Sequence, residues 1–143
     1  MSASTYPLAG LARTTEPTAM LRRFLALDAV VTAGNGVAYA AASGPVGRLL
    51  GVDSGLLLAL GVALAVYGAA VGYLAARKSP PTLAVRAVIE VNALWAVLSV
   101  VAVAVWFSPT VAGAVWIPAQ AVVVGGFAAL QYAALRAGRA ERA

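Results

Sequence analysis

Two carboxylates and an arginine lie inside apolar stretches of this 143-residue chain, where charged side chains are costly. Asp28 falls in the first apolar stretch, whereas Arg86 and Glu90, four positions apart, fall in the third. A charge near the centre of a bilayer costs about 2.5–3.5 kcal/mol on insertion scales, so such groups need partners. Residues four apart share one face of a helix. We therefore predict that Arg86 pairs with a carboxylate and clamps the first stretch to the third.

Further polar side chains fall at matching depths. At about 1.5 Å per helical residue, Asp28 and Gln131 lie equally far from the basic residues that flank their stretches. Tyr73 and Arg86 lie close to that level, and Asn35 and Glu90 define a second, deeper one. We expect one ligand- or ion-binding site with six polar members, namely Asp28, Asn35, Tyr73, Arg86, Glu90 and Gln131.

Helical spacing also assigns faces. The first stretch carries a polar stripe made of Asp28, Thr32, Asn35 and Tyr39, which step by four, three and four positions. In the third stretch, Asn92 points away from Glu90, so we expect it to contact a different neighbour or a second subunit. If the arginine clamp forms, Arg86→Ala should destabilise the fold more than Asn92→Ala.

The charges of the predicted cluster do not balance, because two carboxylates share one arginine. The second carboxylate is expected to be protonated, to meet a cation or to be reached by water. We expect Glu90 to be the protonated one, since it lies deeper than Asp28. The cluster then holds a ligand, ion or proton, only locks helices together, or contacts another membrane subunit.

The composition is that of a membrane protein, with 62% hydrophobic and 10% charged residues. Four apolar stretches are long enough to span a bilayer, and short connections join them. We predict an all-α, transmembrane, up-down-up-down four-helix bundle. Its membrane domain covers residues 21–136, with spans at about 24–42, 55–76, 83–107 and 111–135.

Basic residues set the expected orientation. The two ends of the chain and the connection between the second and third spans carry eight basic residues, whereas the other side carries only Arg48. The positive-inside rule therefore places both termini in the cytoplasm of a bacterium, with the spans in its inner membrane. Residues 1–20 are expected to form a flexible tail there, and residues 137–143 a short basic one.

The missing residue types exclude several functions. The chain has no cysteine and no histidine, so we expect no disulfide, no metal site of the usual kind and no cofactor such as c-type haem. The net charge of +5 does not indicate nucleic acid, because the basic residues flank the apolar spans. The expected partner is the lipid bilayer.

Small residues line one face of the second span. Gly61, Ala65, Gly68 and Gly72 recur at helical spacing, and the last two glycines form a G-x-x-x-G pair. Such faces let a neighbouring backbone approach closely. We expect them to pack within the bundle rather than between copies.

Three functions fit these features. We favour a protein that binds or translocates an ion, a proton or a small amphipathic ligand in a cavity that opens to the cytoplasm. The second is an accessory subunit of a larger membrane complex or a homo-oligomer. The third is a membrane-embedded isomerase or cyclase acting on a lipid-phase substrate, with Glu90 and Asp28 as acid and base.

Two stretches resemble a known group of proteins. RFLALDAVVTAGNGVAYAAASGPVGRLLGV (residues 23–52) and AVRAVIEVNALWAVLSV (residues 84–100) resemble segments of small, uncharacterised four-span integral membrane proteins of the actinobacterial type. In span number and length the chain is also similar to the DoxX-like group. The resemblance implies the four-span fold and carries no functional residue with it.

Overall fold

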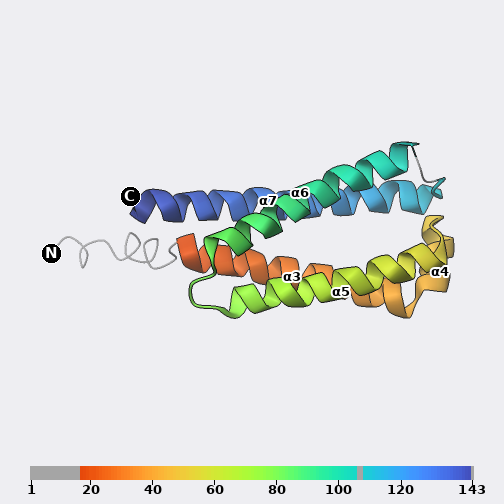
Figure 1. Cartoon of the computed structure of the whole chain (residues 1–143). Coiled ribbons are helices and arrows are strands. Elements are labelled where there is room, and N and C mark those ends of the chain that lie inside the picture. Colours follow the sequence, from red (N-terminus) through yellow and green to blue (C-terminus); the bar gives the residue numbers. More distant parts are fainter. Residues whose placement is uncertain (1–16, 106–107, 143) are drawn as a thin grey trace, which may run out of the picture.

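The computed structural model describes residues 17–105 and 108–142, which form five helices (Figure 1). These are α3 (Pro17–Ala41), α4 (Ser43–Leu50), α5 (Ser54–Ala76), α6 (Thr82–Val105) and α7 (Val111–Arg142). All except α4 are long and apolar enough to cross a membrane. The expected all-helical class is confirmed, and the architecture is that of a multi-pass membrane protein.

Two helices extend beyond the predicted spans. α3 begins at Pro17, a residue type common at the first helical position, and so includes residues 17–20 of the predicted tail. Its Arg22 side chain donates from Nε to the carbonyl of Ala75 at 3.0 Å, which ties the start of α3 to the end of α5. α7 continues to Arg142 because residues 134–142 are mostly alanine and arginine, both strong helix formers. Residues 1–16 of the predicted tail, Trp106 and Phe107 of the third span, and Ala143 lie outside the described residues.

The ends of the helices gather in two places. At one of them, which we call the Pro17 end, a common hollow is surrounded by the start of α3, residues 79–82 and residues 134–138 of α7. At the other, the α4 end, the backbone N–H of Thr110 donates to the carbonyl of Leu50 at 3.2 Å. Gly51 makes this approach possible, because it has φ 73° and a Cβ there would lie 2.7 Å from the Thr110 nitrogen.

Glycines bring α3 and α5 into close contact. A Cβ on Gly36 would lie 2.5 Å from the Ala65 nitrogen, and one on Gly61 would lie 2.5 Å from the Ala40 nitrogen. Gly68 lies almost as close, since a Cβ there would be 2.7 Å from the Ala33 nitrogen. The predicted packing role of the small-residue face is confirmed, since these glycines bring two helices of one chain together.

The long helices form two pairs. α3 packs on α5 and α6 packs on α7, and the pairs meet chiefly through α3 and α7 (Figure 1). Leu21, Leu25, Val71, Val85 and Leu135 form an apolar core near the Pro17 end. Contact between α5 and α6 is slight. The middle of the assembly therefore has room beside α5 and α6, and the polar side chains lie there.

Candidate functional site

The Asp28 carboxylate is completely buried and accepts three hydrogen bonds. Thr32, one turn later on α3, donates to Oδ1 at 2.9 Å. Asn92 of α6 donates from Nδ2 to Oδ2 at 2.7 Å, and Gln131 of α7 donates from Nε2 to the same oxygen at 2.8 Å. One carboxylate therefore ties three helices together.

Asn92 extends this network to the fourth long helix. Its Oδ1 accepts a hydrogen bond from the Tyr67 hydroxyl of α5 at 3.0 Å, and its Nδ2 also donates to Gln131 Oε1 at 3.2 Å. We call these five residues, Asp28, Thr32, Tyr67, Asn92 and Gln131, the Asp28 network. Among the described residues no buried side-chain oxygen or nitrogen lacks a partner. The network therefore holds the helices in register, and each amide has a fixed orientation.

A cavity of about 200 Å³ lies directly beside the network. All four long helices contribute to its wall, and Thr32, Tyr67 and Asn92 belong to both the network and the wall. Its polar lining also includes Asn35, Trp95 and Gln120, and the rest is Val31, Ala63, Leu64, Val91 and Val124. None of the described residues that line it is charged. It is therefore an apolar space with a few neutral hydrogen-bonding groups.

The polar groups of the cavity differ in how well they are satisfied. The Trp95 indole N–H donates to Gln120 Oε1 at 3.3 Å, and Gln120 Nε2 donates to Ser99 at 3.3 Å. The Asn35 side chain, in contrast, makes no hydrogen bond with any residue that the structure describes, although it is half-buried and lines the cavity. Asn35 thus presents an amide with free donors and a free acceptor to whatever occupies the space.

The predicted site residues divide into two groups. Asp28 and Gln131 meet at one level, as their depths indicated, and Asn35 lines the adjoining cavity. Arg86, Glu90 and Tyr73 are instead exposed on the outside of their helices. Tyr67, six positions before Tyr73, takes the place in the network that Tyr73 was expected to have.

The arginine clamp predicted from the sequence is not formed. The partners of Asp28 are a hydroxyl and two amides, and Arg86 is not among them. Asn92 and Glu90 lie on nearly opposite sides of α6, so only one of them can face inward. Asn92 does so together with Val85 and Val88, because burying a neutral amide costs far less than burying a charge. The expected order of destabilisation therefore reverses, and Asn92→Ala should cost more than Arg86→Ala.

The sequence of α6 contains a pattern that predicts a buried Asn92, although the possible pairing of Arg86 with a carboxylate favours the opposite side. Val85, Val88, Asn92 and Ser99 recur at three, four and seven positions, which is the spacing of a buried helical stripe. The opposite side carries Arg86 and Glu90. Hydrophobic periodicity alone therefore predicts that Asn92, and not Glu90, faces the interior, where Asp28 lies.

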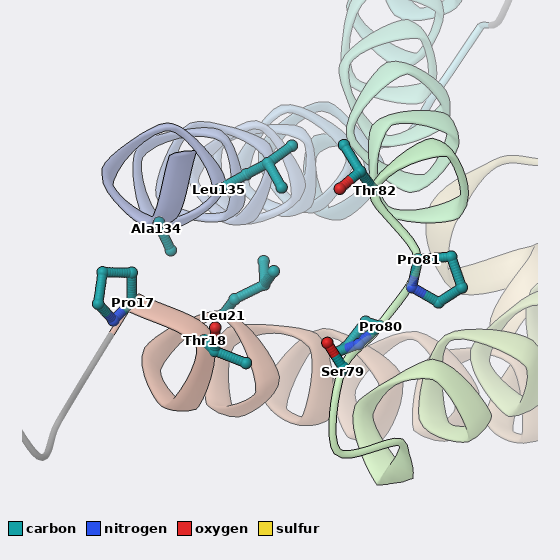
Figure 2. A pocket seen from close by; sticks show the side chains of 10 residues that line it. Pro17, Thr18, Leu21, Ser79, Pro80, Pro81, Thr82, Ala134 and Leu135 are labelled. Carbon is teal, nitrogen blue, oxygen red and sulfur yellow. The ribbon is translucent and has the colours of Figure 1, made fainter. Parts of the chain in front are cut away.

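A second hollow of about 420 Å³ lies at the Pro17 end (Figure 2). Thr18 and Leu21 of α3, Ala134 and Leu135 of α7 and the start of α6 surround it, together with residues 79–81. None of the predicted site residues lines it. Its described polar side chains are the hydroxyls of Thr18, Ser79 and Thr82. The candidate site is therefore the smaller cavity beside the Asp28 network.

The described residues provide no cluster of charged ligands at either hollow. Within residues 17–105 and 108–142, no three His, Cys, Asp or Glu side chains come together as a metal site would require. No family model, no curated protein and no solved structure matches the chain. What the site does must therefore be argued from its own geometry.

Proposed function

We propose that this protein binds a small, uncharged amphipathic molecule in the cavity beside the Asp28 network. The observation that carries the proposal is Asn35, a half-buried amide on the cavity wall without a partner among the described residues. An amide at this depth in a membrane gains from a hydrogen bond that a ligand brings. The neutral lining favours a hydroxyl or carbonyl group over an ion or a proton.

The size of the cavity limits the ligand. A cavity of about 150 Å³ lined by apolar side chains holds one benzene ring, so about 200 Å³ accommodates a ring with a short substituent or a piece of chain of similar size. The lining residues Ala63 of α5 and Val91 of α6 are also exposed at the outer surface. The ligand therefore enters between α5 and α6, from the lipid phase.

A matched pair of probes tests the proposal. 4-Propylphenol and propylbenzene share a ring and a chain, and only the phenol offers a hydroxyl to Asn35. In detergent-solubilised protein, with tryptophan fluorescence as the readout, the phenol should bind about fivefold more tightly, the equivalent of one hydrogen bond of about 1 kcal/mol.

Two variants test whether Asn35 is the source of the preference for the phenol. Asn35→Leu should bind both probes equally, whereas Tyr73→Phe, a change on the exposed side of α5, should keep the preference. Equal binding of both probes to the unmodified protein, or an unchanged preference in Asn35→Leu, would exclude the proposed role of Asn35.

The proposal includes a location and an orientation. The protein lies in the cytoplasmic membrane of a bacterium as an up-down-up-down four-helix bundle, with both termini inside. The support is the distribution of basic residues, because Arg77, Lys78, Arg136 and Arg139 all flank the Pro17 end. In this arrangement the Pro17 end faces the cytoplasm.

Single introduced cysteines test the orientation without background labelling, because the natural chain contains no cysteine. Ser79→Cys lies in the connection at the Pro17 end, and Ser54→Cys begins α5 at the α4 end; both positions are exposed. In intact cells an impermeant thiol reagent should label Ser54→Cys and leave Ser79→Cys unmodified until the membrane is opened. Labelling of Ser79→Cys in intact cells would reverse the proposed orientation.

A further inference from the structure

The outward face of α6 carries charges where a lipid-facing helix is expected to be apolar. Arg86 and Glu90 are exposed on the side opposite the buried Asn92, and they share that side with exposed Ala93, Val97 and Ala104. We call these five residues the α6 outer face. Charged side chains in membrane spans normally face protein or water rather than lipid.

Glu90 is too deep to escape from the hydrocarbon by itself. α6 has 24 residues and is therefore about 36 Å long, and Glu90, eight positions after Thr82, lies about 12 Å from its start. Arg86 lies one turn nearer that start and can extend its long side chain toward the headgroups. A glutamate has no comparable reach, so it needs a partner at its own level.

The chain does not provide that partner among its described residues. Neither Arg86 nor Glu90 forms a hydrogen bond with another described side chain, although the two are one turn apart. Arginine before glutamate is also the less favourable order for a pair within one helix. The charges are thus left for a neighbour outside the chain.

We infer that the α6 outer face binds the same face of a second copy, in a parallel dimer with its two-fold axis along the membrane normal. This symmetry brings equal residues to equal depths, so Arg86 needs to cross only about 6 Å of depth to reach Glu90 of the partner subunit. Two arginines and two glutamates then form a neutral ring. Ala93 and Ala104 allow the two α6 backbones to approach closely.

The sequence itself selects a second copy over an unrelated partner. In the parallel pair equal charges share a depth, so each arginine reaches diagonally to Glu90 of the partner subunit, which lies one turn deeper. A second copy supplies both opposite charges by symmetry, whereas a different membrane protein would need its own anion near Arg86 and its own cation near Glu90. The inference concerns the side of α6 opposite the proposed ligand cavity and does not depend on that cavity.

Cross-linking in native membranes tests the dimer. The chain has no cysteine, so Val97→Cys, at a position 60% exposed on the α6 outer face, introduces a single thiol. Oxidation should produce a disulfide-linked dimer. Val122→Cys is the matched control, because Val122 is 75% exposed but belongs to α7 and not to the α6 outer face. The Val122→Cys variant should remain monomeric. Absence of the Val97→Cys dimer, or its cross-linking only to another protein, would overturn the inference.

Charge exchange tests the arrangement of the ring. In the Val97→Cys background, Arg86→Glu gives a face with two anions and Glu90→Arg gives one with two cations. Each variant alone should cross-link to itself about tenfold less, because like charges meet. Co-expressed with different tags, the two should cross-link to each other at the original level. Undiminished self-cross-linking of either variant, or no recovery on mixing, would contradict the ring.

A milder change guards against poor insertion of the charge variants. The double variant Arg86→Gln, Glu90→Gln removes both charges and keeps hydrogen-bonding side chains of similar length. At unchanged expression it should cross-link through Val97→Cys less than the parent does. Equal cross-linking would show that the charges do not drive the association and would overturn the inference.

Discussion

Gly36→Ala should separate α3 from α5 and lower the free energy of unfolding by about 1–3 kcal/mol, the usual cost of overfilling a packed contact. The new Cβ would lie 2.5 Å from the Ala65 nitrogen and 2.7 Å from the Gly61 oxygen. Both are backbone atoms, so no side-chain rotation relieves the clash. Titration with SDS in detergent micelles, followed by circular dichroism, measures the loss.

Gly34→Ala is the control on the same helix. A Cβ at Gly34 has nothing within 4 Å, so the substitution brings only the usual advantage of alanine over glycine in a helix, about 0.5–1 kcal/mol. The two variants should therefore change stability in opposite directions. Equal stability of Gly36→Ala and the parent protein would mean that α3 and α5 are less closely packed than these distances require.

Asp28→Leu should have a comparable or larger effect through the polar network. Leucine keeps the branched shape of aspartate but replaces both oxygens with larger methyl groups. Thr32 Oγ1 and Gln131 Nε2 then lose their acceptor, and Asn92 Nδ2 keeps only Gln131 Oε1. Hydrogen bonds between membrane helices average about 0.6 kcal/mol, whereas an unsatisfied buried group costs about 1–3 kcal/mol. We expect a loss of at least roughly 2 kcal/mol in the same SDS titration.

Two further variants distinguish the contribution of the Asp28 network to stability from the contribution of charged side chains in general. Asp28→Asn keeps one oxygen for Asn92 and Gln131, so it should lose less stability than Asp28→Leu. Arg86→Ala removes an exposed side chain that lies outside the network and should cost the monomer little. A larger loss for Arg86→Ala than for Asp28→Leu would restore the arginine clamp and reject the network.

Periodicity predicted much of the fold and half of the site. The four spans follow from apolar length, and the inward stripe of α3 follows from the spacing of Asp28, Thr32, Asn35 and Tyr39, none of which is exposed. The shared level of Asp28 and Gln131 follows from the rise per residue, which holds equally in both helices. These inferences depend on the geometry of single helices.

The remaining half of the site depends on how each helix is rotated about its own axis. The residue pattern of a single helix does not determine that rotation. α6 carries polar groups on two sides, and either could face inward. Pairing of opposite charges favoured Glu90, but desolvation decides in an apolar interior, and it favours the amide of Asn92. The role of Tyr67 is not predictable from α5 alone, because its hydroxyl reaches Asn92 only when the rotations of α5 and α6 are both fixed.

The pairing of the helices divides the molecule into two hairpins, one made of α3, α4 and α5 and the other of α6 and α7. Their polar groups differ in kind: the first hairpin holds the carboxylate, and the second holds the two amides that donate to it. At the α4 end, the Trp116 indole of the second hairpin donates to the Tyr39 hydroxyl of the first at 2.7 Å. The hydrogen bonds between the hairpins nevertheless run in both directions, because the Tyr67 hydroxyl of the first hairpin donates to Asn92 of the second. The first hairpin offers Asp28 only the Thr32 hydroxyl, so the carboxylate gains its two amide donors when the second hairpin packs against the first.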